Sequence, residues 1–165
     1  MADTIRIIDF GSQVTQLIAR RLRETGVYTE ILPCTTAPHN IAAAAPKGII
    51  LSGGPNSVAL ADTPRAPQIV FDLSVPIFGI CYGQQTICAQ LGGRVEPGTS
   101  REFGRAELEI KEQSALFDDI WSQQSRPTVW MSHGDHVAAL PDGFKVLATS
   151  AGAPYAVVED AARRY

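Results

Sequence analysis

One cysteine of this chain stands where a strand is expected to turn sharply into a helix. The stretch "PIFGICYGQQ" (residues 76–85) is apolar up to Ile80 and continues with Cys81, Tyr82 and Gly83. Gly79 and Gly83 leave room for a turn too tight for β-carbons, which is the geometry of a nucleophile elbow. In such a turn the start of the following helix would stabilise a thiolate, and the Tyr82 N–H would point to where an oxyanion forms.

The alternative for Cys81 is an ordinary buried thiol, because free cysteine is among the most buried residue types. The motif alone leaves both interpretations open. We expect Cys34, beside Pro33, and Cys88, further along the same helix as Cys81, to be core thiols. Three cysteines at irregular spacing argue against a disulfide framework or a zinc site, so each thiol should be free.

A second loop contains two glycines at the end of another predicted strand. The stretch "ILSGGPNS" (residues 50–57) should therefore lie at the same sheet edge as Cys81. Gly53 and Gly54 let bare backbone approach a ligand, and their amides could supply a second oxyanion donor. A tight turn is the simpler alternative. A phosphate-binding loop is weaker, because no Gly-Lys-Ser/Thr follows.

A third loop is predicted at "WMSHGDHV" (residues 130–137). His133, Asp135 and His136 suggest a metal site or a general base, but no further ligand cluster supports a metal. Either histidine could act on Cys81 only if the fold brings it within hydrogen-bond reach. A surface turn is the alternative. We expect His39, in a polar loop, to be exposed.

The elements that must position these loops alternate along the first half of the chain. Strands are predicted at residues 4–10, 27–32, 47–54 and 75–80, with helices starting near 14, 39, 66 and 83. Val14, Leu17, Ile18 and Leu22 recur at helical spacing on one face, and Gly26 is placed to end that helix. Alternation of this kind predicts a doubly wound, mainly parallel α/β sheet. In the second half, strands at residues 103–110, 127–132, 144–150 and 154–160 predict antiparallel hairpins.

Composition narrows the class of protein. The 165 residues carry a formal net charge of −3, which gives no electrostatic reason to bind nucleic acid or an anionic membrane. No apolar run approaches the ~18 residues that span a bilayer, and the N-terminus lacks a signal-peptide pattern. These features predict one cytoplasmic globular domain.

Five motifs in this order resemble the class I glutamine amidotransferases, and within them the glutaminase domains of the GMP synthase family. They are "DFGSQ" (9–13), "SGGP" (52–55), "GICYGQQ" (79–85), "REFG" (101–104) and "WMSHGD" (130–135). The third motif is typical of the whole class, while the first and last are typical of this member. The resemblance implies a flavodoxin-like sheet.

The resemblance also implies a role for each matching residue. Cys81 would form a glutamyl thioester, and the N–H groups of Gly54 and Tyr82 would form the oxyanion hole. The residues implied to hold the substrate, L-glutamine, are Gly53, Gln85, Ser132, Gly134 and Asp135.

One part of the family pattern is missing. The family completes its catalytic triad with the histidine and glutamate of a "His-Pro-Glu" motif, and no histidine here precedes Pro-Glu. In the family that motif follows a segment like "PYAVVEDAARRY" (154–165). We therefore expect residues 1–165 to form a single domain that is incomplete at its C-terminal end, with at most trace glutaminase activity. We also expect an unpaired sheet edge that favours self-association.

The family further implies what uses the ammonia. An ATP-dependent synthetase (ATP pyrophosphatase) domain of the same enzyme would convert XMP to GMP, and ATP and Mg²⁺ would belong to that domain. Glutamine hydrolysis itself needs no cofactor. Two alternatives remain: a glutamine-binding regulatory module without catalysis, and a redox protein with a reactive cysteine on a flavodoxin-like sheet.

Overall fold

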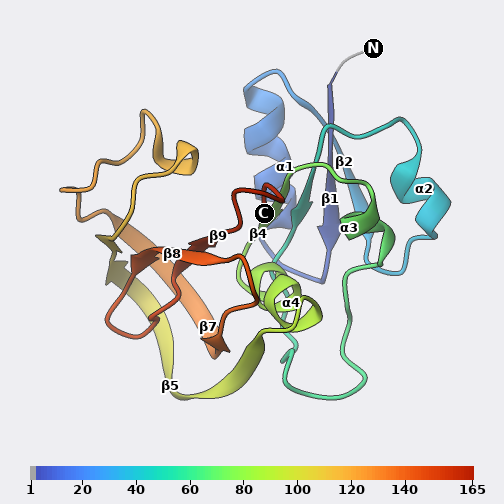
Figure 1. The fold of residues 1–165 in the computed structure, drawn as a ribbon. Helices are drawn as coiled ribbons and strands as arrows, with labels where there is room; N and C mark the ends of the chain where they lie inside the picture. The colour runs from blue at the N-terminus through green and yellow to red at the C-terminus, as the bar shows by residue number, and fades with distance from the viewer. Residues whose placement is uncertain (1–2) are drawn as a thin grey trace.

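The first half of the chain forms a four-stranded sheet in the computed structural model, which describes residues 3–165 apart from the side chains of residues 99–102. The strands are β1 (Thr4–Asp9), β2 (Tyr28–Pro33), β3 (Gly48–Leu51) and β4 (Ile77–Gly79). Their order is β2-β1-β3-β4 and every pair is parallel, which confirms the predicted α/β sheet (Figure 1). The carboxyl ends of all four strands therefore meet at one edge, where ligands bind in open parallel sheets.

Four helices connect or follow these strands: α1 (Thr15–Glu24), α2 (Pro38–Ala42), α3 (Ile69–Asp72) and α4 (Tyr82–Gln90). Gly26, at φ +84°, follows α1 in the left-handed conformation, as predicted. Two helices are shorter than their patterns predict. The segment from 39 ends early because Ala44 and Ala45 have positive φ. The segment from 66 loses its first turn because the Ala66 backbone N–H and C=O are both bound by the Gln90 side chain.

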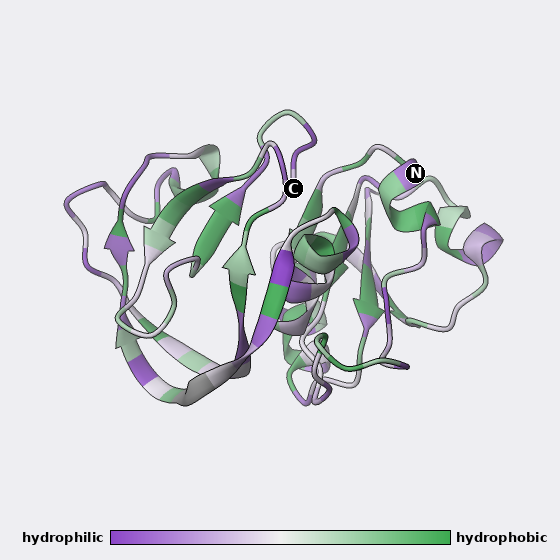
Figure 2. Cartoon of the chain, turned by 60° about the horizontal axis from the view of Figure 1, so that its bottom comes forward, coloured by the Kyte–Doolittle hydropathy of each residue, from purple (hydrophilic) through white to green (hydrophobic). Residues whose placement is uncertain are grey.

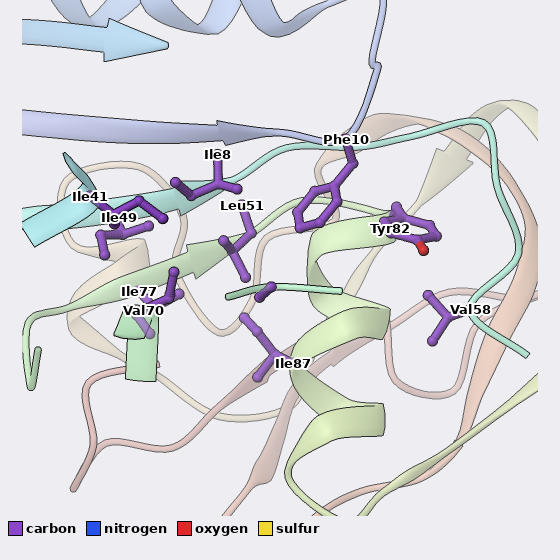
Figure 3. Close-up of a cluster of buried hydrophobic side chains, with 11 residues drawn as sticks. Ile8, Phe10, Ile41, Ile49, Leu51, Val58, Val70, Ile77, Tyr82 and Ile87 are labelled. Carbon is purple, nitrogen blue, oxygen red and sulfur yellow. The ribbon is translucent and has the colours of Figure 1, made fainter. Parts of the chain in front are cut away.

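One face of the sheet carries the main hydrophobic core. Ile8, Ile49, Leu51 and Ile77 pack there against side chains of α2, α3 and α4 (Figure 3). Parallel strands supply continuous apolar runs because helices cover both faces. The core holds the strand ends, and with them the loops that follow, in fixed positions.

The opposite face is covered by α1, which lies across the sheet from α2 and α3 (Figure 1). Thr15 and Ala19 are its buried residues, so the prediction that Val14 and Leu17 belong to the buried face is wrong. These two side chains are 48% and 49% exposed. The small Thr15 and Ala19 face the sheet instead, because small side chains let a helix lie close to it.

The second half is antiparallel, as predicted. A long ribbon pairs β5 (Arg94–Glu107) with β7 (Thr128–Ala139), and a three-stranded sheet joins β6 (Glu109–Ile110), β8 (Lys145–Thr149) and β9 (Val157–Glu159). The short helix η1 (Ala115–Phe117) helps to close a second core that includes Phe117 and Leu147. Among the strands of residues 3–165, only β8 and β9 form a hairpin of consecutive strands.

One predicted loop belongs to this ribbon. Residues 130–137 lie within strand β7 and not in a loop, so that prediction is wrong. The local register explains the loop-like sequence, because the pairing with β5 is interrupted between Pro97 and Glu102, opposite Gly134. The segment is a strand whose pairing with β5 is interrupted at Gly134. At that point its backbone groups can contact other parts of the chain.

The two halves lie side by side, with α4 in contact with both β5 and β7 (Figure 2). The C-terminal residues return to the first half, where the Ile77 N–H donates to the Arg164 carbonyl at 3.0 Å. Within the described residues, no helix has the length and apolar character needed to cross a lipid bilayer.

Candidate active site

The predicted sharp turn at Cys81 is present. Cys81 lies between β4 and α4 with φ +54° and ψ −110°, a conformation that costs a non-glycine residue free energy. The neighbouring glycines make the turn possible. A β-carbon at Gly83 would lie 2.2 Å from the Leu51 carbonyl oxygen, and one at Gly79 would lie 2.7 Å from the Gln84 nitrogen. The strained cysteine is typical of a nucleophile elbow.

The glycine loop after β3 reaches the same place. A β-carbon at Gly53 would lie 3.7 Å from Cβ of Cys81, and one at Gly54 would lie 2.7 Å from the Phe10 carbonyl oxygen. The loop is therefore packed between Cys81 and the segment that follows β1. The prediction that both loops share one sheet edge is confirmed.

The helix that starts after Cys81 is anchored by Tyr82. Its ring is 1% exposed and packs against Phe10 with ring centroids 5.2 Å apart, while its hydroxyl donates to the Pro64 carbonyl at 2.6 Å. The Tyr82 N–H lies against the Cys81 sulfur, where it favours the thiolate. That N–H makes no hydrogen bond to another backbone group among the described residues.

Strand β7 closes the site from the second half of the chain. The Cys81 thiol donates to the Ser132 carbonyl at 3.5 Å, and Gln85 Nε2 of α4 donates to the Asp135 carbonyl at 3.0 Å. These contacts join residues that are about 50 positions apart in the chain. The interrupted register near Gly134 leaves these carbonyls available to α4.

A pocket of about 380 Å³ opens between these elements. Six of the predicted site residues line it: Gly54, Cys81, Gln85, Ser132, Gly134 and Asp135. Gly53 and Tyr82 lie behind this lining, next to Cys81. The lining also includes Pro55, Asn56, Ser57 and Phe103, to which the sequence assigned no individual role, and His133, which the sequence offered as a metal ligand or general base. Asn56 and Ser57 could have been found from their place in the same loop, after Gly53, Gly54 and Pro55.

The pKa of the Cys81 thiol is raised, whereas the sequence predicts surroundings that favour the thiolate. Burial raises the pKa of its thiol, and the negative charge of Asp135 raises it further, while the Tyr82 N–H lowers it. The N–H at the start of α4 favours the thiolate, as expected, but burial outweighs it and the net shift of the pKa is upward. The enclosed position of the sulfur outweighs the one N–H that faces it.

The other two cysteines behave as predicted core thiols to different degrees. Cys88 is fully buried, and burial raises its pKa to about 12. Cys34 is only partly buried, although it packs against the main core, and burial raises its pKa as well. All three thiols are free.

The histidines fall in three different places. His133 lines the pocket, His136 pairs with Glu96 across the ribbon, and His39 is exposed in α2, as predicted. Across residues 3–165 as described, no group of three or more His, Cys, Asp or Glu residues is arranged to hold a metal ion. In the "REFG" motif, the side chains of Arg101 and Glu102 lie outside the described residues, and Phe103 lines the pocket.

Comparison with known proteins places this site in a family. The model of glutamine amidotransferase class-I matches residues 6–164. The chain therefore belongs to the class I glutamine amidotransferases, which confirms the family resemblance.

Individual relatives and solved structures show how similar the chain is to particular proteins of this class. The chain is 61% identical over 163 residues to the glutamine-hydrolyzing GMP synthase of Allorhizobium ampelinum, and 59% identical to that of Brucella melitensis. The match covers 99% of this chain but 31% and 32% of those proteins, so the chain spans about a third of their length. A Thermoplasma acidophilum protein assigned as a GMP synthase subunit superposes with a TM-score of 0.81 at 28% identity, over 99% of this chain and 81% of its own. A Thermotoga maritima glutamine amidotransferase shares the fold, with a TM-score of 0.72 at 19% identity over 96% of this chain and 74% of its own.

Proposed function

We propose that this chain is the glutamine-hydrolysing part of a GMP synthase. The observation that carries the proposal is the strained Cys81 at the mouth of a pocket that is closed by β7, in a chain 61% identical to such an enzyme. The sulfur would attack the side-chain amide carbon of glutamine and form a thioester. The C–N bond breaks, the nitrogen takes up a proton and leaves as ammonia, and water then cleaves the thioester to glutamate.

The pocket supports a division of roles among its residues. The N–H groups of Gly54 and Tyr82 would stabilise the oxyanion formed in each step. Gly53, Gln85, Ser132, Gly134 and Asp135 would hold the amino and carboxylate groups of glutamine. Asp135 supports this role, because its Oδ2 is buried without a hydrogen-bond partner among the described residues. The ammonium group of a bound amino acid is a donor that would satisfy such an oxygen.

The use of the ammonia belongs to the same proposal. The relatives are about three times as long as this chain, and we place the ATP- and Mg²⁺-dependent synthetase domain that converts XMP to GMP in that additional length. Hydrolysis of glutamine would need no cofactor. Three free thiols are consistent with a reducing, cytoplasmic environment.

The sequence also supports a second candidate, a glutamine-binding module without catalysis. None of the three histidines in the sequence is followed by Pro-Glu. The histidine and glutamate that would activate Cys81 in the family are therefore not among these 165 residues. Loss of a triad member costs several orders of magnitude in rate. We therefore expect this chain to bind glutamine and to hydrolyse it at no more than a trace rate.

Alkylation of Cys81 tests both candidates. An electrophilic glutamine analogue, 6-diazo-5-oxo-L-norleucine, should label Cys81 in preference to Cys34 and Cys88, as mapped by mass spectrometry. Glutamine should block the labelling, asparagine should not, and Cys81→Ser should abolish it. Labelling without selectivity would contradict a glutamine pocket. Turnover at the rate of an intact amidotransferase, abolished by Cys81→Ala, would contradict the non-catalytic candidate.

A further inference from the structure

We propose that Ser52, held in place by Asp9, is a positioning residue that orients the Gly53–Gly54 peptide so that the Gly54 N–H faces the pocket. The inference rests on the proposed function, since it assigns a purpose to that N–H. It concerns two side chains, one on β1 and one directly after β3, that lie outside the pocket lining.

The Ser52 side chain lies at the centre of a short hydrogen-bond chain. The residue is 0% exposed. Its hydroxyl oxygen accepts from the Phe10 N–H at 3.1 Å and lies 2.9 Å from the Gly53 carbonyl oxygen and 3.2 Å from Asp9 Oδ1. A hydroxyl has one proton, so the two acceptors share it, and the shorter contact is to Gly53. Ser52 thus fixes the position of the Gly53 carbonyl from the side of β1.

Because a peptide is planar, the contact of Ser52 with the Gly53 carbonyl also sets the direction of the Gly54 N–H. No peptide among the described residues is cis, so the C=O of Gly53 and the N–H of Gly54 point in opposite directions. The hydroxyl holds the carbonyl toward the buried side, and the N–H therefore points the other way. Gly54 lines the pocket, and within the described part of the chain its N–H donates to no other backbone group.

A peptide between two glycines needs such a restraint. Glycine has few forbidden backbone angles, so the Gly53–Gly54 peptide can rotate with little steric penalty. Rotation would direct the Gly53 carbonyl into the pocket and remove an oxyanion donor. Gly54 must remain glycine because of its approach to Phe10, so the orientation has to be set by a neighbour, and Ser52 is the side chain in contact.

Asp9 holds Ser52 and the segment beside it. Its Oδ1 accepts from the Thr15 hydroxyl at 2.8 Å and from the Gly11 and Ser12 N–H groups at 3.0 and 3.3 Å, in addition to Ser52. The same segment packs on the glycine loop, because a β-carbon at Gly53 would lie 3.4 Å from Ser12 Oγ. Asp9 therefore joins the turn after β1 to the loop after β3.

Two electrophiles distinguish an effect on the orientation of the Gly54 N–H from an effect on binding of the glutamine analogue. The chloroketone analogue of glutamine reacts with a thiol through a tetrahedral adduct whose oxygen needs the oxyanion donors, whereas iodoacetamide reacts by direct displacement. In the full chain, Ser52→Ala should lower the maximal rate of Cys81 labelling by the chloroketone about tenfold. The chloroketone concentration that gives half the maximal rate should stay within about twofold of the wild-type value. The rate of Cys81 labelling by iodoacetamide should also stay within about twofold of wild type. Ser114→Ala is the matched control, because Ser114 is also a buried, hydrogen-bonded serine and lies in the antiparallel half.

The structure of the variant gives an independent result. In a crystal structure of Ser52→Ala, we expect the Gly53 carbonyl to be turned toward the pocket, in full or in a second conformation. An unchanged peptide together with an unchanged chloroketone rate would overturn the inference while leaving the proposed function intact. If the wild-type chain reacts with iodoacetamide but not with the chloroketone, the proposed function fails. The orientation of the Gly53–Gly54 peptide in Ser52→Ala then decides the inference alone.

Discussion

The sulfur of Cys81 lies 3.5 Å from the carbonyl oxygen of Ser132, a residue 51 positions further along the chain. A carbonyl oxygen accepts from the thiol and does nothing to stabilise a thiolate. The contact therefore belongs to the protonated cysteine, in agreement with the raised pKa of its thiol. The nucleophile is positioned in this structure, and both its burial and this contact favour the protonated thiol.

The raised pKa of the Cys81 thiol predicts how its alkylation depends on pH. We expect the rate of Cys81 labelling by iodoacetamide to rise with a midpoint above the free-thiol pKa of ~8.5. Asp135→Asn should move the midpoint down, because it removes a negative charge that raises the pKa of Cys81. Asp62→Asn, at an exposed position, should leave it unchanged. A wild-type midpoint below the free-thiol value would show that the start of α4 outweighs burial.

The turn at Cys81 predicts an unequal effect of two glycine substitutions. Gly83→Ala places a β-carbon 2.2 Å from the Leu51 carbonyl, so the backbone must move. We expect a loss of more than about 3 kcal/mol in the free energy of unfolding, measured by urea denaturation. Gly134→Ala is the control, because no atom lies within 4 Å of its added β-carbon and the change should stay below about 1 kcal/mol. Equal effects would contradict the close contact of α4 with β3.

Asp9 predicts a stability difference that depends on pH. Burial raises the pKa of its carboxyl, but hydrogen bonds from Thr15, Gly11, Ser52 and Ser12 outweigh burial and hold the pKa below its ordinary value. The stabilisation is therefore present above the unfolded pKa of ~3.9 and is lost as the pH falls through the lower folded pKa. Asp9→Asn should be less stable than wild type at pH 6, with the gap narrowing below about pH 4. A gap that stays constant from pH 6 to pH 3 in urea titrations would contradict this role.

An exposed apolar side chain on the edge strand β4 predicts self-association. Ile7, Ile50 and Phe78 form one row across β1, β3 and β4, and Phe78 at its end is 46% exposed. Exposed apolar side chains on an edge strand favour contact between molecules. Phe78→Gln should reduce concentration-dependent association in light scattering, whereas Leu60→Gln, at a 60% exposed position outside any strand, should not. A wild-type chain that stays monomeric at high concentration would exclude this surface as an interface.

Much of the site could be predicted from local sequence. Cys81 stands between two glycines after an apolar strand, and the second pair of glycines follows another strand in the same way. Because parallel strands end at one edge, these two patterns suffice to bring the loops together. Helix bounds were predicted less well where a side chain such as Gln90 competes for the backbone of Ala66.

By itself, the sequence determined the parallel sheet, the strained turn at Cys81 and the glycine loop beside it. These features depend on short stretches whose backbone angles and apolar spacing act locally. Only the tertiary structure decided that residues 130–137 form a strand against α4, and that Ser52 lies between Asp9 and the Gly53 carbonyl. It also decided the direction of the Cys81 pKa. Burial and charge act through space on groups far apart in the chain, so no local pattern contains them.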